Sequence, residues 1–137
     1  MAERQYELGT AELEVLKVLW DHGPATVRDV LAHLHEAGRH VAYTTVQTLL
    51  TRLEQKRFVA SNKSGMAFVY RAKLTRERVS RSRIDSLLAQ LYDGAAGPLM
   101  LHLLESDRLT PGEITELQKL IEKLDREQPG EAGRGKA

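Results

Sequence analysis

Three segments with helical periodicity follow one another within the first 56 residues, and this succession limits the fold more than any other feature. They are expected at residues 10–22, 26–36 and 42–56, where apolar residues recur at the spacing that places them on one face of a helix. Thr10 and Thr26 are the predicted N-caps of the first two, and glycine follows the end of each of these two segments. The pattern therefore predicts three short amphipathic helices.

A hairpin is predicted directly after these helices. Two short apolar runs, at residues 58–60 and 67–72, flank a polar stretch at 61–65 that contains a turn-forming glycine. Three helices followed by a hairpin are the element order of a winged helix-turn-helix domain, which we expect over residues 1–74. The predicted fold class is accordingly mainly α with a small β-hairpin wing (α+β).

Three further helices are predicted after the hairpin, at residues 76–92, 99–104 and 111–125. The first and last have apolar stripes that need a cover: Ile84, Leu87, Leu88, Leu91, Ile114, Leu117, Ile121 and Leu124. We therefore expect residues 75–125 to form a helical dimerisation region. Residues 126–137 are polar and rich in glycine, and they are predicted to be a disordered tail.

Positive charge is concentrated in the middle of the chain. Residues 39–83 contain eleven Lys or Arg and only two acidic residues, a net charge of +9, whereas the segments on either side each carry −4. The whole chain carries only +1. A basic block of this density indicates an anionic partner, although a charged, solvated surface would give the same composition.

The polar face of the predicted helix 42–56 lies within this block. It contains short hydrogen-bonding side chains where an ordinary solvent-facing helix would more often have Glu and Lys: Thr44, Gln47, Thr48, Thr51 and Gln55, flanked by Thr45 and Arg52. Threonine is a poor helix former, so this face opposes local helix stability. A helix that enters the major groove needs such side chains to bond base edges, and Gln47 suits adenine. The alternative is that these are ordinary surface residues, or that Thr44 or Thr45 acts near the N-cap.

Several cations are candidates for contacts with DNA phosphates. Arg52, Lys56 and Arg57 are placed near the end of the predicted helix, where they suit phosphate oxygens. Lys63, at the tip of the predicted hairpin, either contacts a phosphate or the minor groove or belongs to a plain solvated turn.

Other kinds of function find little support in the sequence. The absence of cysteine excludes thiolate metal sites and disulfides, the five histidines are scattered, and no phosphate-binding loop or nucleophile elbow occurs. We expect no catalytic activity, no metal and no cofactor. No apolar run is long enough to span a membrane and the N-terminus does not read as a signal peptide, so a cytoplasmic location is expected.

Specific motifs of the sequence resemble a known family. LGTAELEVLKVLWDHGPATVRDVLAHL, AYTTVQTLLTRLEQKRFV and the strand ending in FVYRA are similar to the penicillinase-repressor (BlaI/MecI-type) family, strongly over about residues 8–74. The resemblance implies a cytoplasmic homodimer that represses transcription, in which each winged helix binds one half of a palindromic operator. It implies a recognition helix at 42–56, with the base-facing residues Thr44, Thr45, Gln47 and Thr48 and the phosphate contacts Arg52, Lys56 and Lys63. Genes of the β-lactam-resistance type, or other stress-related genes, would be regulated.

The chain departs from the family in its C-terminal part. Members that control β-lactam resistance are inactivated by cleavage at an Asn-Phe bond, initiated by a membrane sensor protease. The matching position here is His102-Leu103, which leaves the role of a regulatory protease open. A copper-responsive branch uses clustered cysteines, and this chain has none. A protein-interaction module on a winged-helix scaffold, without DNA specificity, stays the alternative function.

Overall fold

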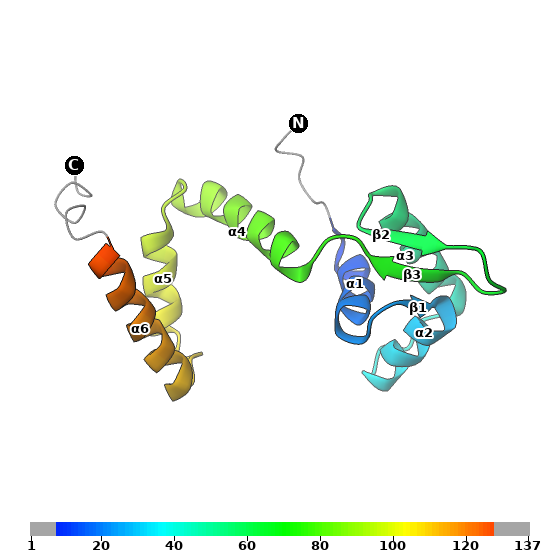
Figure 1. Cartoon of the computed structure of the whole chain (residues 1–137), viewed down its shortest axis with the longest axis horizontal. Helices are drawn as coiled ribbons and strands as arrows, with labels where there is room; N and C mark the ends of the chain where they lie inside the picture. Colours follow the sequence, from blue (N-terminus) through cyan, green and yellow to red (C-terminus); the bar gives the residue numbers. More distant parts are fainter. Residues whose placement is uncertain (1–7, 128–137) are drawn as a thin grey trace. The chain divides into compact units, whose positions relative to one another are not determined.

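The predicted fold class is confirmed: the chain is mainly helical with one small antiparallel sheet (Figure 1). The computed structural model describes residues 8–127. Contacts divide the chain into two compact units, residues 1–87 and 88–137. The elements are, in order, α1 (Thr10–His22), β1 (Ala25–Thr26), α2 (Val27–Glu36), α3 (Tyr43–Gln55), β2 (Val59–Asn62), β3 (Val69–Ala72), α4 (Arg76–Tyr92), α5 (Ala96–Glu105) and α6 (Pro111–Glu127).

The N-cap of helix α1 lies one residue before the predicted position. The cap is Gly9, and Thr10 is the first helical residue, so the prediction that Thr10 caps the helix is wrong. The reason is Glu12, whose carboxylate oxygen Oε1 accepts a hydrogen bond from the Gly9 N–H at 3.0 Å. This is the reach of an N3 glutamate back to the N-cap, so the position of Glu12 sets the start of the helix.

Helix α2 begins as predicted. The Thr26 hydroxyl accepts from the Asp29 N–H, and the Asp29 carboxylate accepts from the Thr26 N–H, both at 3.1 Å, which completes a capping box. At the other end Gly38 has φ +88°, a left-handed conformation that costs glycine little, and the Arg39 N–H bonds back to Leu34 at 2.8 Å. This turn allows α3 to start five residues later.

The sheet contains one strand that the sequence did not predict. The two residues of β1 pair with β3, which also pairs with β2, and all pairings are antiparallel in the order β1-β3-β2. A two-residue strand has no periodicity to detect. The predicted hairpin is present, but Phe68 lies outside β3 and is 45% exposed, because the strand begins at Val69 and buries Tyr70 instead.

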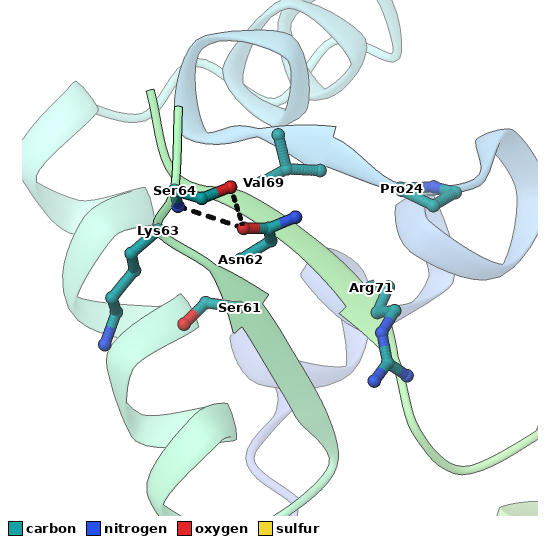
Figure 2. Close-up of a pocket in the computed structure, with 7 residues that line it drawn as sticks. All are labelled: Pro24, Ser61, Asn62, Lys63, Ser64, Val69 and Arg71. Carbon is teal, nitrogen blue, oxygen red and sulfur yellow. Dashed lines mark hydrogen bonds between the residues drawn. The ribbon is translucent and has the colours of Figure 1, made fainter. Parts of the chain in front are cut away.

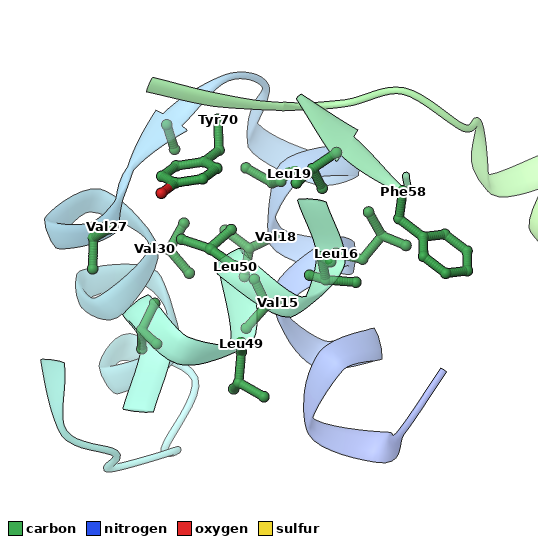
Figure 3. Close-up of a cluster of buried hydrophobic side chains, with 14 of the residues drawn as sticks. Val15, Leu16, Val18, Leu19, Val27, Val30, Leu49, Leu50, Phe58 and Tyr70 are labelled. Atoms are coloured by element: carbon green, nitrogen blue, oxygen red, sulfur yellow. The ribbon is translucent and has the colours of Figure 1, made fainter. Parts of the chain in front are cut away.

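One hydrophobic core holds the first unit together (Figure 3). It takes side chains from α1, α2, α3 and the sheet, and Val79 of α4 also joins it. Val15, Leu16, Val30 and Leu50 are fully buried. At about 1.5–3 kcal/mol for each buried aliphatic side chain, this core fixes α3 firmly in the domain.

The backbone between α3 and β2 contains an unusual residue. Arg57 has φ +71°, in the left-handed region that favours glycine. Its N–H bonds to the carbonyl of Glu54 at 3.0 Å, and the next residue, Phe58, bonds to Leu53 at 2.9 Å and is buried. The turn directs the chain straight from the end of α3 into the core.

The helices of the second unit expose much apolar surface. Among the described residues, α5 and α6 bury no side chain. Leu91, Leu101 and Ile121 are 66%, 61% and 57% exposed. Helix α5 starts at Ala96, three residues before the predicted Leu99, and so contains Pro98 in its first turn. Proline is tolerated there because the N–H that it lacks would have no partner within the helix.

Helix α6 continues to Glu127, so Arg126 and Glu127 are helical and do not belong to the predicted tail. Both are charged side chains compatible with a helix, so polarity alone was a poor boundary signal. The remainder of the predicted tail, residues 128–137, lies outside the described residues.

Candidate nucleic-acid interface

Helix α3 has two faces of opposite character. Val46, Leu50 and Leu53 are fully buried and Leu49 is 8% exposed. The other face is exposed along its whole length and contains six of the eight predicted DNA-binding residues: Thr44, Thr45, Gln47, Thr48, Thr51 and Arg52. The structure therefore brings these six together on one solvent-facing surface, held from behind by the core.

The hydroxyl group of Thr51 is already engaged as a donor. Its Oγ1 donates to the backbone carbonyl of Gln47 at 2.9 Å, one helical turn earlier. The hydroxyl oxygen keeps its capacity to accept a hydrogen bond, and the side chain also has a methyl group. Thr51 is consequently suited to apolar contact or to accepting a bond.

Lys56 is tied to the first helix. Its Nζ donates to Oε1 of Glu12 at 2.8 Å, across 44 residues of sequence. The Glu12 side chain is only 6% exposed, whereas that of Lys56 is 40% exposed. This ammonium group was expected at a phosphate, and the structure gives it a partner within the protein that anchors the end of α3 to α1.

The pKa of Glu12 reflects this arrangement. Burial is the largest single influence and raises the pKa of Glu12, but the hydrogen bonds from Lys56 and the Gly9 N–H and the nearby positive charges together outweigh it. The charges of Lys56 and Arg52 act in the same direction. The pKa of Glu12 therefore lies below its usual value, and the group stabilises the fold while it is ionised.

We expect Glu12→Gln to lower the free energy of unfolding at pH 7 by about 1–2 kcal/mol, less than for a fully buried pair because Lys56 is partly solvated. Because the folded-state pKa is lowered, the contribution is complete above the unfolded-state pKa. It disappears as the pH falls from there through the folded-state pKa. Urea unfolding of both proteins at neutral pH and through the acid range measures the difference.

Glu14→Gln is the matched control on the same helix. Glu14 accepts a bond from Arg39 at 3.0 Å, but the two side chains are 34% and 51% exposed, so solvent screens the pair and about 0.5 kcal/mol or less is expected. Equal effects of the two substitutions would show that the bond between Glu12 and Lys56 does not anchor α3.

The wing supplies a second basic surface. Lys63 lies at the start of the loop between β2 and β3 and its Nζ is 5.4 Å from the centre of the Phe68 ring. Lys63 and Arg71 line an open hollow of about 680 Å³ together with Pro24 and polar residues of β2 (Figure 2). Asn62 shapes the loop, since its Oδ1 accepts bonds from the backbone and hydroxyl of Ser64 at 3.0 and 2.7 Å.

Two further exposed cations were not predicted from the sequence as DNA contacts. Arg71 follows the buried Tyr70 in β3, so strand alternation places it on the exposed side. Arg28, in the first turn of α2, lies 5.6 Å from the ring centre of Tyr43, the first residue of α3. Alternation was a usable signal for Arg71, whereas the contact between Arg28 and Tyr43 depends on the packing of two helices.

The described residues contain no group of three or more His, Asp or Glu side chains able to hold a metal ion. His22 and His33 do approach each other, with ring centres 3.7 Å apart and planes inclined by 12°. Stacked rings direct their nitrogen lone pairs along parallel planes, so they do not converge on one ion. No helix within residues 8–127 has the length and apolar character to cross a membrane.

Comparison with known proteins identifies the relatives of this chain. The family model described as "Penicillinase repressor" matches residues 8–123. The penicillinase repressor of Bacillus licheniformis is 32% identical over 116 residues, which cover 85% of this chain and 90% of that protein. The methicillin resistance regulatory protein MecI of Mammaliicoccus sciuri is 26% identical, over 90% of this chain and 99% of that one.

Solved structures include the DNA-binding domain of the repressor BlaI. It is 31% identical to this chain with a TM-score of 0.48, and the match covers 55% of this chain and 90% of that domain. The family resemblance inferred from the sequence is confirmed, because the family model spans most of the chain. This chain belongs to the penicillinase repressor family.

Proposed function

We propose that this protein is a sequence-specific DNA-binding transcriptional repressor that places α3 in the major groove of its operator. One observation carries the proposal: a helix whose inner face is buried presents an unbroken row of exposed threonine and glutamine side chains in a chain of the penicillinase repressor family. Repression agrees with the names of its relatives from Bacillus licheniformis and Staphylococcus aureus.

The chemistry of the surface suits double-stranded DNA. Gln47 has an amide that can pair with adenine through two hydrogen bonds, and threonine methyl groups can pack on thymine methyls. Arg52 on α3, Arg28 on α2 and Lys63 on the wing supply cations for the phosphate backbone on either side. Lys56 adds positive charge while it holds α3 in place.

The operator is expected to have dyad symmetry. The exposed apolar side chains of α5 and α6 favour association of two copies through the C-terminal helices, and a two-fold dimer reads two equivalent half-sites. Such a repressor acts in the cytoplasm, where the DNA is. Resistance-related or other stress-related genes are the proposed targets, in view of the relatives' names.

Selection of bound fragments from the genomic DNA of the source organism tests this function. We expect recovery of one or a few fragments that share an inverted repeat, with an affinity that falls steeply as salt increases. A protein-interaction module without DNA specificity would recover fragments at random. Random recovery at low salt, by a chain shown to be folded, would reject the repressor function in favour of that module.

A further inference from the structure

A hollow of about 360 Å³ lies between α1 and the first half of α4, and no residue of α3 lines it. Leu13, Lys17 and Trp20 line it from α1, at positions that fall on one helical face. Arg76, Val79, Arg83 and Ile84 line it from α4, again on one face. All of these residues belong to the first unit. The volume is within the range of sites for small organic ligands, ~300–1,000 Å³.

The walls of this hollow are apolar and partly preformed. The indole Nε1 of Trp20 donates to the backbone carbonyl of Leu74 at 2.8 Å, which fixes the orientation of the ring. Val79 is buried against the core, whereas Ile84 is 48% exposed. The Trp20 ring is already held in place and the Ile84 side chain is exposed, so an apolar ligand can cover both with little reorganisation of the protein.

The rim of the hollow is positively charged. The Arg76 guanidinium lies 5.3 Å from the centre of the Trp20 ring and bonds to Asp21. Lys17 and Arg83 make no ion pair within 4.0 Å among the residues that the structure describes. Three cations thus share one carboxylate. The hydrogen bond from Arg76 and the charge of Lys17 both lower the pKa of Asp21, which leaves Arg83 as the cation with no acidic partner within 4.0 Å among the described residues.

We propose that this hollow binds a small organic anion, a carboxylate attached to an aromatic or branched aliphatic body. The apolar body covers Trp20 and Ile84, and the carboxylate lies at the rim near Lys17 and Arg83. A second copy of the chain fits less well, because a two-fold contact through this hollow would bring its cations against their own copies. A DNA backbone, which offers phosphates and sugars, leaves the apolar walls uncovered.

Occupation of this site would regulate the repressor, an extension that rests on the proposed function. Helix α4 starts beside α1 and supplies residues to both compact units. If the packing of α1 against α4 differs between the free and the operator-bound protein, a ligand that contacts both helices binds these two states with different affinities. Binding of ligand and binding of operator are then linked, and each changes the other by the same factor.

Trp20 provides a direct measurement, because it is the only tryptophan of the chain. Titration of the full chain with hydrocinnamate should change the Trp20 fluorescence saturably, with a Kd of roughly 1 mM or below. Its neutral amide, which has the same apolar body, should bind at least about tenfold more weakly if the rim cations recognise the carboxylate. Heptanoate serves as the aliphatic carboxylate probe.

Paired variants of α4 test the position of the site. Arg83→Gln should weaken hydrocinnamate at least about fivefold, whereas Arg78→Gln, on the same helix but outside the hollow, should leave its affinity unchanged. No saturable response to either carboxylate, equal affinity for the amide, or equal effects of the two variants would overturn the proposal. So would a Trp20 signal that follows protein concentration instead of the probe, which would assign the hollow to a second copy.

The fluorescence measurement involves no DNA. Binding of hydrocinnamate by a chain that selects no operator would reject the repressor function and keep the ligand site. Selection of an operator by a chain that binds neither carboxylate would reject the ligand site and keep the repressor function. With both present, hydrocinnamate at saturation should shift operator affinity at least about threefold, and no shift would remove the regulatory role.

Discussion

Replacement of Thr44, Gln47 and Thr48 together by alanine is expected to reduce affinity for the selected operator to the level of non-specific binding, a loss of about 10³-fold or more. The three side chains are exposed on α3 and contribute nothing to the core. Each lost contact to a base edge removes about 1–3 kcal/mol of discrimination, so the three together remove about 3–9 kcal/mol, which is comparable to the usual margin of about 4–10 kcal/mol between specific and non-specific sites. Titration of labelled operator and of an unrelated duplex at several salt concentrations measures the loss.

The triple variant should keep its fold and its non-specific binding. Alanine is a better helix former than threonine, so the melting temperature of the triple variant should equal or slightly exceed that of the unmodified chain. The variant Gln90→Ala/Thr115→Ala is the control, since it removes an exposed amide and an exposed hydroxyl from α4 and α6. Undiminished operator binding by the triple variant would mean that the exposed face of α3 is not the reading surface.

Replacement of Ile121 by glutamate is expected to dissociate the dimer. Ile121 is 57% exposed in the single chain and belongs to the apolar stripe of α6. Placing an unpaired carboxylate in an apolar interface costs several kcal/mol, so the dimer dissociation constant should rise by about 10²-fold or more. Sedimentation at micromolar concentration should show a dimer for the unmodified chain and a monomer for the variant.

Operator affinity should be lost together with dimerisation, because two half-sites are no longer bound by one linked pair of domains. Lys119→Glu introduces the same side chain two residues away, about 200° around α6, and it should leave the dimer intact. A variant at Ile121 that sediments like the unmodified chain would place the dimer contact elsewhere. A monomeric unmodified chain would contradict the two-fold operator model itself.

The two faces of α3 were predictable from the sequence, because burial in a short helix follows its 3.6-residue period and the core needed Val46, Leu49, Leu50 and Leu53. The cap of α2 was predictable for a similarly local reason. The same logic could have identified Gly9, since the spacing of Glu12 from it is that of an N3 residue from its cap.

Other features depend on contacts that no local pattern encodes. The bond between Lys56 and Glu12 joins residues 44 apart, and Lys56 on its own looks like any cation at the end of a basic helix. Strand β1 exists only because its two residues lie beside Tyr70 and Val69 in β3. The stripes of α5 and α6 were visible in the sequence, but periodicity does not identify the surface that covers them.

Helix α3 has its anchoring residues on one face and its exposed residues on the other, and this separation has an evolutionary consequence. Its anchoring residues are constrained by close packing, so few substitutions there are tolerated. The outward residues touch no core, and many replacements for threonine would even improve helix formation. Duplicated copies of such a gene can therefore diverge toward new target sequences by changes on one helical face, without first acquiring compensating mutations that preserve folding.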